Sequence, residues 1–157
     1  MAIEIVKFSA ELAPHFERLN REWIEKLFVM EEPDLAELKH PGRIMETGGE
    51  ILFARLNGRI VGTGALQRLT DETFEIVKMG VDETCRGQGV GRSLMGGLIE
   101  AARARGVRRI RIETNSSLAA ANALYRKCGF AAARDQSSQH GYARADVFLE
   151  LDLSAGP

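Results

Sequence analysis

The stretch RGQGVGRS, residues 86–93, places three glycines at alternate positions between two arginines. It follows the strand-like run FEIVKMGV, residues 74–81, and leads into the helix-like run VGRSLMGGLIEAARARG, residues 90–106. Glycines at the start of a helix leave backbone N–H groups uncovered, so that a phosphate can approach them. The flanking arginines add positive charge at the same place. The segment therefore predicts either a pyrophosphate-binding loop or a tight turn that needs glycine for its shape alone.

Two familiar nucleotide-binding patterns do not fit this loop. A P-loop ends in Gly-Lys-Ser/Thr, and Arg92 stands where the lysine belongs. A Rossmann fingerprint, Gly-x-Gly-x-x-Gly, also fails at Arg92, although Glu113 lies where a ribose-binding acid is expected. That fold needs further βα units after the acid, but little chain remains, and an antiparallel pattern precedes the loop. A Rossmann site is therefore rejected on architecture.

Length and composition exclude several classes of protein. The chain has 157 residues and a net charge of −1, which predicts one domain over residues 1–153 and a flexible tail over 154–157. The charge argues against binding to nucleic acid, and no apolar run is long enough to span a membrane. The N-terminus lacks a secretory signal, and Cys85 and Cys128 make neither a disulfide framework nor a metal site. The three histidines show no metal-ligand spacing, so we expect a cytoplasmic protein without a metal.

Hydrophobic periodicity predicts one mixed α/β (α+β) sheet. A strand at 2–8 is followed by a long helix ending near residue 28 and a short helix near 34–39, which Pro41 and Gly42 end. Asn57-Gly58 favours a type I′ turn in a hairpin that leads to the strand at 74–81. After the glycine loop the pattern predicts a helix, a strand, a second helix and two last strands. These segments are residues 90–106, 107–114, 117–129, 130–135 and 143–151.

Three stretches together resemble the GNAT superfamily of N-acetyltransferases: VDETCRGQGVGRSLM (81–95), IET (112–114) and ALYRKCGF (123–130). The stretches LNREWIEKLF and EIVKMGV are also similar to the acetyltransferase half of certain bacterial regulator–acetyltransferase fusions, although this chain is too short for their DNA-binding half. The resemblance implies a mostly antiparallel sheet of about six or seven strands, a central parallel splayed pair, and about four helices. The residues that match the family's loop and its second landmark are Arg86, Gly89, Gly91, Leu124, Tyr125, Gly129 and Phe130.

The resemblance implies acetyl-CoA as cosubstrate, held in a V-shaped cleft between the strands 74–81 and 108–114. The backbone of Met79, Gly80 and Val81 would hold the pantetheine arm, and Gly80 would suit a β-bulge. The family's pantetheine-binding asparagine is replaced by Leu118, so Asn115 is our suggested substitute, with Asn122 nearby. The predicted pyrophosphate site comprises Arg86, Gly87, Gln88, Gly89, Val90, Gly91, Arg92 and Ser93.

The resemblance also implies the residues that move protons. Tyr125 matches the tyrosine that protonates the departing thiolate, and a phenol stays protonated at neutral pH. Glu75 is the first candidate for the general base, because regular alternation would place it on the apolar face of Val77, Met79 and Val81 and so raise its pKa. Glu113 is the rival. The alternatives are a core tyrosine, an exposed acid at a strand start, and for Glu113 a surface partner of a neighbouring arginine.

A polar loop near the C-terminus is expected to border the acceptor site in proteins of this kind. It carries His140, Tyr142 and Arg144, and the guanidinium of Arg144 would suit a substrate carboxylate. Trp23 and Phe28 would wall the same pocket, unless they belong to the core.

We therefore expect an acetyl-CoA-dependent N-acetyltransferase that acts on a primary amine of a small molecule or peptide, with a homodimer as a family-based expectation. The alternative is a non-catalytic acyl-CoA-binding sensor that uses the same cofactor motifs.

Overall fold

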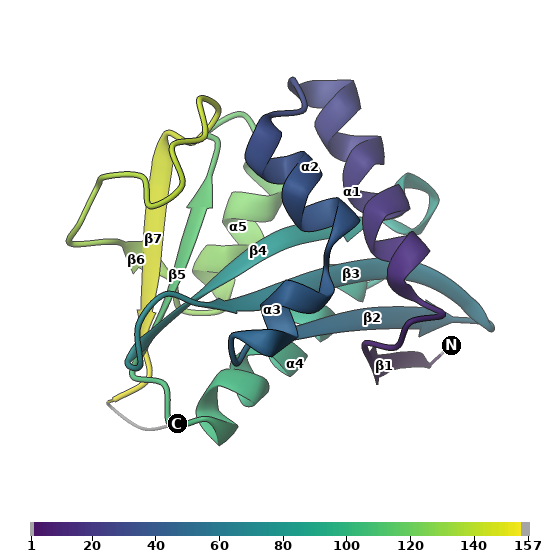
Figure 1. Cartoon of the computed structure of the whole chain (residues 1–157), viewed down its shortest axis with the longest axis horizontal. Helices are drawn as coiled ribbons and strands as arrows, with labels where there is room; N and C mark the ends of the chain where they lie inside the picture. Colours follow the sequence, from purple (N-terminus) through teal and green to yellow (C-terminus); the bar gives the residue numbers. More distant parts are fainter. Residues whose placement is uncertain (1, 155–157) are drawn as a thin grey trace.

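The computed structural model describes residues 2–154, which form a seven-stranded sheet with helices on both faces (Figure 1). Residues 155–157 of the predicted tail lie outside the described residues. The strand order is β1-β2-β3-β4-β5-β7-β6, and β4 and β5 are the parallel pair. The strands are β1 (Ile3–Lys7), β2 (Glu50–Leu56), β3 (Arg59–Arg68), β4 (Thr73–Val81), β5 (Arg109–Thr114), β6 (Ala131–Ala132) and β7 (Val147–Asp152). The predicted fold class, a mixed and mostly antiparallel sheet, is confirmed.

The described residues contain five α-helices, one more than the roughly four predicted. They are α1 (Ala13–Leu27), α2 (Glu32–Lys39), α3 (Gly42–Glu46), α4 (Val90–Ala104) and α5 (Ala119–Lys127), with a short 3₁₀ helix, η1, at Glu83–Cys85. The additional helix is α3, which begins after Pro41, where the sequence was expected to leave helical structure. Pro41 has φ −62°, and proline lacks only an N–H that the first helical turn does not use. Pro41 therefore separates two helices and starts the second.

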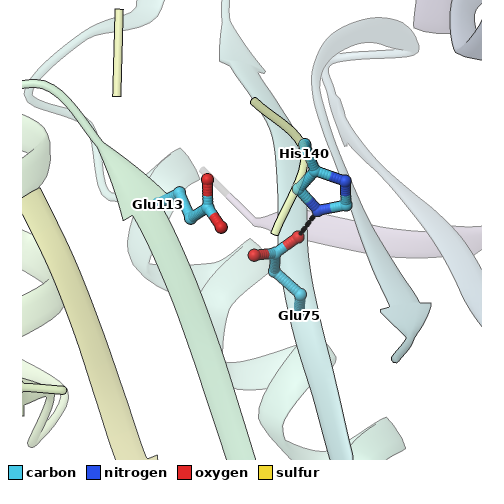
Figure 2. Close-up of side chains that lie close together, drawn as sticks. All are labelled: Glu75, Glu113 and His140. Atoms are coloured by element: carbon cyan, nitrogen blue, oxygen red, sulfur yellow. Dashed lines mark hydrogen bonds and ion pairs between the residues drawn. The ribbon is translucent and has the colours of Figure 1, made fainter. Parts of the chain in front are cut away.

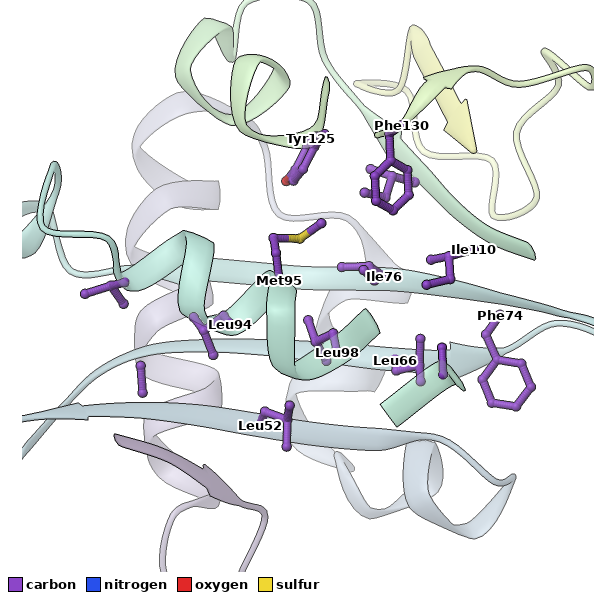
Figure 3. Packing of buried hydrophobic residues seen from close by; sticks show 14 of the residues in the cluster. Leu52, Leu66, Phe74, Ile76, Leu94, Met95, Leu98, Ile110, Tyr125 and Phe130 are labelled. Atoms are coloured by element: carbon purple, nitrogen blue, oxygen red, sulfur yellow. The ribbon is translucent and has the colours of Figure 1, made fainter. Parts of the chain in front are cut away.

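Two apolar cores lie on opposite faces of the sheet. Ile51 and Phe53 of β2 are fully buried against α1, α2 and α3, whereas Leu52 of the same strand faces α4. Figure 3 shows the α4 side, where Leu94 and Leu98 pack on the sheet. Other labelled members of this core are Leu66, Phe74, Ile76, Met95, Ile110, Tyr125 and Phe130. Because both faces are covered, the central strands read as near-continuous apolar runs.

The two predicted hairpins have different outcomes. Asn57 and Gly58 have φ values of 52° and 77° and join Leu56 to Arg59, so the two-residue type I′ turn is confirmed. The strand expected over 130–135 shortens to Ala131–Ala132. Beyond it the backbone N–H of Ala133 still donates to the carbonyl of Phe148 at 2.9 Å, and the Gln136 side chain donates to the carbonyls of Ala133 and Phe148.

The parallel strands β4 and β5 separate early. They pair only from Thr73 to Glu75, opposite Arg109 to Arg111, and the rest of each strand has no partner on that side. On its other edge β4 carries a β-bulge, because Thr63 pairs with Gly80 while Ala65 pairs with Val77.

The bulge lies at Lys78 and Met79, not at Gly80 as predicted. Lys78 takes a left-handed φ of 54°, and this extra residue reverses the alternation of side chains. Val77 therefore packs against the core under α1, whereas Met79 and Val81 pack against the core under α4. The expectation that Glu75 shares a face with Met79 and Val81 is wrong for this reason, and of the three residues named only Val77 lies on the face of Glu75.

Gly80 has a different role from the one predicted, since it lets α1 lie directly on β4. A Cβ at this position would lie 2.9 Å from the carbonyl oxygen of Leu19 and 3.2 Å from Cδ1 of Trp23. Backbone atoms cannot move aside as a flexible side chain can, so any larger residue would push α1 away from the sheet.

We predict that Gly80→Ala lowers the free energy of unfolding by about 1–3 kcal/mol, the usual cost of overpacking a core. Gly96→Ala is the matched control, because Gly96 is a helical residue of α4 whose added Cβ meets nothing within 4 Å. Alanine favours a helix over glycine by about 0.5–1 kcal/mol, so this control should be neutral or stabilising. Urea unfolding measures both, and equal stability of the two variants would contradict the close contact.

Candidate active site

The separation of β4 from β5 opens a cleft of about 730 Å³. Its walls come from β4, β5, the loop between η1 and α4, α5, the end of α1, and the loop between β6 and β7. Trp23 and Phe28 both line it, with their rings 6.2 Å apart in an edge-to-face arrangement. The cleft runs along β4, and the seven residues from Glu75 to Val81 span roughly 20 Å of strand.

The glycine loop closes one end of this cleft. Gly87 and Gly89 have left-handed φ values of 80° and 84°, so the turn itself requires glycine. A Cβ added at either position meets nothing within 4 Å, which means that open space lies in front of the loop. Gly89 caps α4, and the first backbone N–H groups of a helix have no intrahelical acceptor. The loop is thus both a tight turn and a cradle that fits a diphosphate.

Most of the predicted cofactor residues line the cleft. Those that do so are Met79, Gly80, Val81, Arg86, Gly87, Gly89, Val90, Gly91, Arg92, Asn115 and Tyr125. Gln88, Ser93 and Asn122 are not among the lining residues, and the Gln88 side chain turns back to within 3.5 Å of the Thr84 carbonyl oxygen.

The two asparagines hold the turn between β5 and α5. Asn115 donates from Nδ2 to the carbonyl of Arg144 at 2.7 Å and accepts from the backbone N–H of Ser117 at 2.8 Å. Asn122 donates to the carbonyl of Asn115 at 3.0 Å. Both side chains therefore have a structural task, and a role of Asn115 toward pantetheine stays a prediction.

Tyr125 projects from α5 into the buried wall of the cleft. Its residue is 7% exposed, and its ring lies 6.4 Å from that of Phe130. Burial, with a smaller contribution from Cys128, raises the pKa of Tyr125 to about 12. The phenol is therefore protonated throughout the neutral range.

Glu75, Glu113 and His140 come together from three separate segments (Figure 2). Glu75 is fully buried and accepts a hydrogen bond at Oε1 from Nε2 of His140, while its Oε2 has no hydrogen-bond partner among the described residues. Glu113 accepts from the hydroxyl of Ser138 at 2.7 Å and the backbone N–H of Gln139 at 2.6 Å. Neither glutamate is an exposed acid, because the side chain of Glu113 is only 4% exposed.

The cluster has perturbed proton affinities. Burial raises the pKa of Glu75 although the hydrogen bond from His140 opposes this. The same hydrogen bond raises the pKa of His140, and burial opposes it. Such coupled shifts are typical of sites that transfer protons.

The cluster is also the one group of the described residues whose donors could hold a metal ion, since one ligand atom from each residue lies within 4.8 Å of the others. Sequence spacing could not reveal it, because the three residues are far apart in the chain. Arg111 lies 3.8 Å from Glu113 and already supplies positive charge there. The ligand atoms of Glu75, Glu113 and His140 also suit the ammonium group of an amine. An ammonium carries one positive charge, whereas a divalent metal ion carries two.

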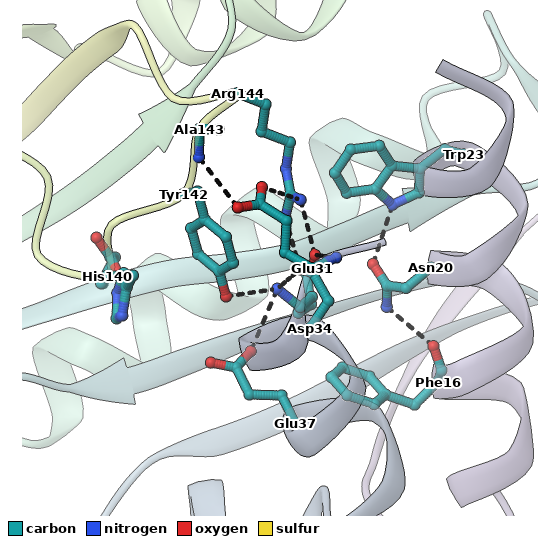
Figure 4. A network of polar contacts seen from close by, with 12 residues as sticks. Phe16, Asn20, Trp23, Glu31, Asp34, Glu37, His140, Tyr142, Ala143 and Arg144 are labelled. Atoms are coloured by element: carbon teal, nitrogen blue, oxygen red, sulfur yellow. Dashed lines mark hydrogen bonds and ion pairs between the residues drawn. The ribbon is translucent and has the colours of Figure 1, made fainter. Parts of the chain in front are cut away.

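A buried ion-pair network joins α2 to the loop that carries His140 (Figure 4). Asp34 of α2 is fully buried and accepts from both terminal nitrogens of Arg144, at 2.6 and 2.7 Å. It also accepts from Nζ of Lys78 at 2.8 Å, and Lys78 in turn donates to the hydroxyl of Tyr142 at 3.0 Å. Glu31 and Glu37 complete the network at 3.4 Å from Arg144 and 3.3 Å from Lys78.

This network corrects one expectation and adds residues that the sequence analysis missed. Arg144 is paired with Asp34, so its guanidinium is not free for a substrate carboxylate as predicted. Lys78 was the one charged residue in the second half of an apolar strand, which was a signal that it had a buried partner. Asp34 gave no such signal, because an acid at a helix start is ordinary.

The family follows from comparison with known proteins. The model of the acetyltransferase (GNAT) family matches residues 15–130. The chain belongs to the acetyltransferase (GNAT) family. Acetyl-CoA is the cosubstrate typical of these acetyltransferases, and the open glycine loop fits its pyrophosphate. The likeness to the regulator fusions stays a prediction.

Two curated relatives are similar over part of the chain. "IAA acetyltransferase" of Azospirillum brasilense is 37% identical over 65% of this chain and 67% of its own length. "Uncharacterized N-acetyltransferase YvbK" of Bacillus subtilis is 33% identical over 60% of this chain and 59% of its own length. The matches thus span about two thirds or less of these relatives.

Solved structures share the whole fold. A GNAT-family acetyltransferase from Staphylococcus aureus Mu50 superposes with a TM-score of 0.86 at 21% identity, covering 97% of this chain and 99% of that chain. The acetyltransferase yncA from Salmonella typhimurium, solved with acetyl-CoA, gives a TM-score of 0.77 at 20% identity over 98% and 95% of the two chains. Among the described residues of our chain, no helix is long and apolar enough to cross a membrane.

We predict that Asp34→Asn destabilises the protein by about 3–5 kcal/mol at pH 7, because it leaves two buried cations without their shared carboxylate. Burial alone would raise the pKa of Asp34, but the hydrogen bond from Arg144 and the charge of Lys78 lower it to about 2 from its ordinary 3.8. The stabilisation is therefore fully present above pH 3.8 and is lost as the pH falls toward about 2. Urea unfolding against pH measures this loss.

Asp71→Asn is the control for this prediction, because Asp71 pairs with Arg68 on the surface and its side chain is 90% exposed. Such a pair contributes at most about 1 kcal/mol. Similar losses of unfolding free energy in Asp34→Asn and Asp71→Asn would show that the buried network stabilises the protein no more than a surface ion pair does.

Proposed function

We propose that this GNAT-family protein is an acetyl-CoA-dependent N-acetyltransferase that acetylates a primary amine of a small molecule or peptide. One observation carries the proposal: the cleft that fits a CoA pyrophosphate also contains two buried carboxylates beside a histidine. An acetyltransferase that acts on amines must bind a cation and then remove a proton from it. Glu75, Glu113 and His140 supply negative charge and a proton acceptor for those two tasks.

The acceptor is expected to be an amine with an apolar part. Trp23 and Phe28 offer apolar surface in the same cleft, and the buried carboxylates favour an ammonium group next to it. A homodimer and a cytoplasmic location stay expectations.

The residues of the cleft divide the proposed reaction between them. Acetyl-CoA supplies the activated acetyl group as a thioester. In this proposal the backbone N–H groups at the bulge in β4 and along its unpaired end hold the thioester and stabilise its oxyanion, a role supported by their lack of partners on the β5 side. The cluster of Glu75, Glu113 and His140 takes the proton of the amine, and Tyr125 protonates the sulfur that leaves.

A non-catalytic acyl-CoA sensor is the alternative. A sensor needs the glycine loop but has no use for Tyr125 or for a buried carboxylate cluster in the same cleft. A thiol-release assay with tyramine, spermidine, lysine and an unblocked tetrapeptide distinguishes the N-acetyltransferase from the sensor. Release of CoA with at least one amine supports the enzyme, whereas tight acetyl-CoA binding without release from any of them supports the sensor.

We predict that Tyr125→Phe lowers kcat about 10²–10⁴-fold, the usual contribution of a general acid, with an unchanged Kd for acetyl-CoA. The substitution removes only the hydroxyl, so the packing against Phe130 is kept. The thiol-release assay gives kcat and calorimetry gives Kd. Unchanged turnover would remove Tyr125 from the mechanism, and a loss confined to affinity would make it a binding residue.

A further inference from the structure

The pair of Glu75 and His140 links two segments that lie 65 residues apart in the chain. Glu75 is fully buried on β4, whereas the side chain of His140 is 16% exposed and lines the cleft. Figure 2 shows Nε2 of His140 directed at Glu75 and the second ring nitrogen, Nδ1, on the side of the ring away from that carboxylate. Nδ1 forms no hydrogen bond with any described residue. The imidazole therefore has one nitrogen held by the protein and one that is available.

This arrangement fixes which nitrogen can accept a proton. An ionised Glu75 accepts the hydrogen of Nε2, so the neutral ring carries its lone pair on Nδ1. Glu75 itself is poorly placed to meet an amine, because it has no exposed surface and its other oxygen lies on the side of Glu113 (Figure 2). Of the three groups in the cluster, His140 has the side-chain surface that faces the cleft most openly.

We propose that His140 is the group that takes the proton from the acceptor amine, with Glu75 as the positioning residue that holds its ring. This inference rests on the proposed function and deepens it. Glu113 keeps its hydrogen bonds to the loop that carries His140, and so helps to hold the ring near Glu75.

The acetyl transfer conserves both protons and bonds. The bound ammonium gives one proton to Nδ1 of His140 and becomes a neutral amine. The amine nitrogen forms a bond to the acetyl carbon, the carbon–sulfur bond breaks, and Tyr125 donates its proton to the sulfur. The new amide nitrogen releases its second proton, which restores the phenol of Tyr125. His140 then returns its proton to water, so that the products are the amide, the CoA thiol and one proton.

The charges around His140 suit such a base. Glu75 from β4, Glu113 from β5 and Glu37 from α2 act on it with negative charge. Of the cations nearby, Arg111 acts on Glu75 and lies 3.8 Å from Glu113, whereas Lys78 lies over the ring of Tyr142, which is 5.6 Å from the His140 ring. The hydrogen bond to Glu75 outweighs burial and raises the pKa of His140 above its ordinary 6.5. Below that pKa the ring is protonated and cannot accept a proton, so the reaction rate rises as the pH passes through it.

The loop geometry also supports a placed histidine. The backbone N–H of His140 donates to the hydroxyl of Ser138 at 3.2 Å, and that hydroxyl donates to Glu113. Tyr142, two residues on, accepts from Lys78, and Arg144 is paired with Asp34. The loop is therefore fastened on both sides of His140.

The test is the pH dependence of kcat/KM for the wild type, His140→Gln and Glu75→Gln, with the fastest amine of the thiol-release assay. Glutamine keeps a donor near the place of Nε2 but has no basic nitrogen at the place of Nδ1. We expect His140→Gln to lower kcat/KM about 10²–10⁴-fold at pH 7, with a loss that shrinks at high pH, where the amine arrives deprotonated. Glu75→Gln should instead move the acidic limb of the kcat/KM profile to lower pH. An amide does not stabilise the imidazolium, so the pKa of His140 falls.

Two further measurements separate a chemical role from a structural one. An NMR titration of the His140 ring protons should give a pKa above 6.5 that falls in Glu75→Gln, and added imidazole should restore activity to His140→Gly. The control is His40→Gln, since His40 is an exposed residue at the end of α2 and outside the cleft. The kcat/KM of His40→Gln should match that of the wild type at every pH.

A wild-type pH profile in His140→Gln, together with an inactive Glu75→Gln, would assign the proton to Glu75 and overturn the inference while leaving the N-acetyltransferase intact. The inference would also be overturned if His140→Gln lost the same fraction of kcat/KM at every pH and imidazole did not restore activity to His140→Gly. A wild type that acetylates no amine would overturn the proposed function, and this inference with it.

Discussion

The molecule depends on one interruption of backbone hydrogen bonding: β4 and β5 stop pairing after Glu75 and Arg111. On the other edge of β4, the bulge at Lys78 and Met79 turns the strand further from regular geometry. A sheet that stayed paired would bury these peptide groups in a ladder. Here the end of β4 keeps its N–H and C=O groups facing a cleft, and the glycine loop begins just after it. The cleft that we propose as the acetyl-CoA site is thus a gap in the protein's own sheet.

The other end of the gap contains more charge than a protein interior normally accepts. Two buried carboxylates, Glu75 and Glu113, face one another, and Asp34 lies buried nearby with Lys78 and Arg144. Buried ion pairs are weak contributors to net stability, because the loss of hydration offsets much of the attraction. What this network does supply is position. It fastens the loop that carries His140 to α2 and to β4, so that the ring meets Glu75 across the cleft.

Features determined by neighbouring residues could be predicted from the sequence. Asn57-Gly58 specifies its turn through φ alone, and the apolar stripe of α4 shows its buried face. Gly87 and Gly89 reveal the cradle because few other residues tolerate their backbone conformation. The resemblance to the family supplied the parallel splayed pair, which no local pattern predicts.

Features that depend on distant residues could not be predicted in this way. The bulge lies at Lys78 and not at Gly80, and the glycine is needed because of the backbone of Leu19 in α1, which lies 61 residues earlier in the chain. Arg144 looked free because its partner, Asp34, comes from α2. His140 was expected only in a loop bordering the acceptor site, and its pairing with Glu75 gave no signal because that partner lies on another strand. In each case the missing information was a contact between two segments that are far apart in sequence.

Calorimetric titration of the folded protein with acetyl-CoA tests whether the gap between β4 and β5 is an acetyl-CoA site. NAD⁺ is the control, because it carries a similar pyrophosphate but no pantetheine arm to lie along β4. We expect saturable one-to-one binding of acetyl-CoA and no measurable binding of NAD⁺. Equal binding of both would mean that the loop recognises any diphosphate and that β4 contributes nothing. No binding of acetyl-CoA would mean that the glycines only shape a turn. It would contradict the assignment of the gap between β4 and β5 as an acetyl-CoA site.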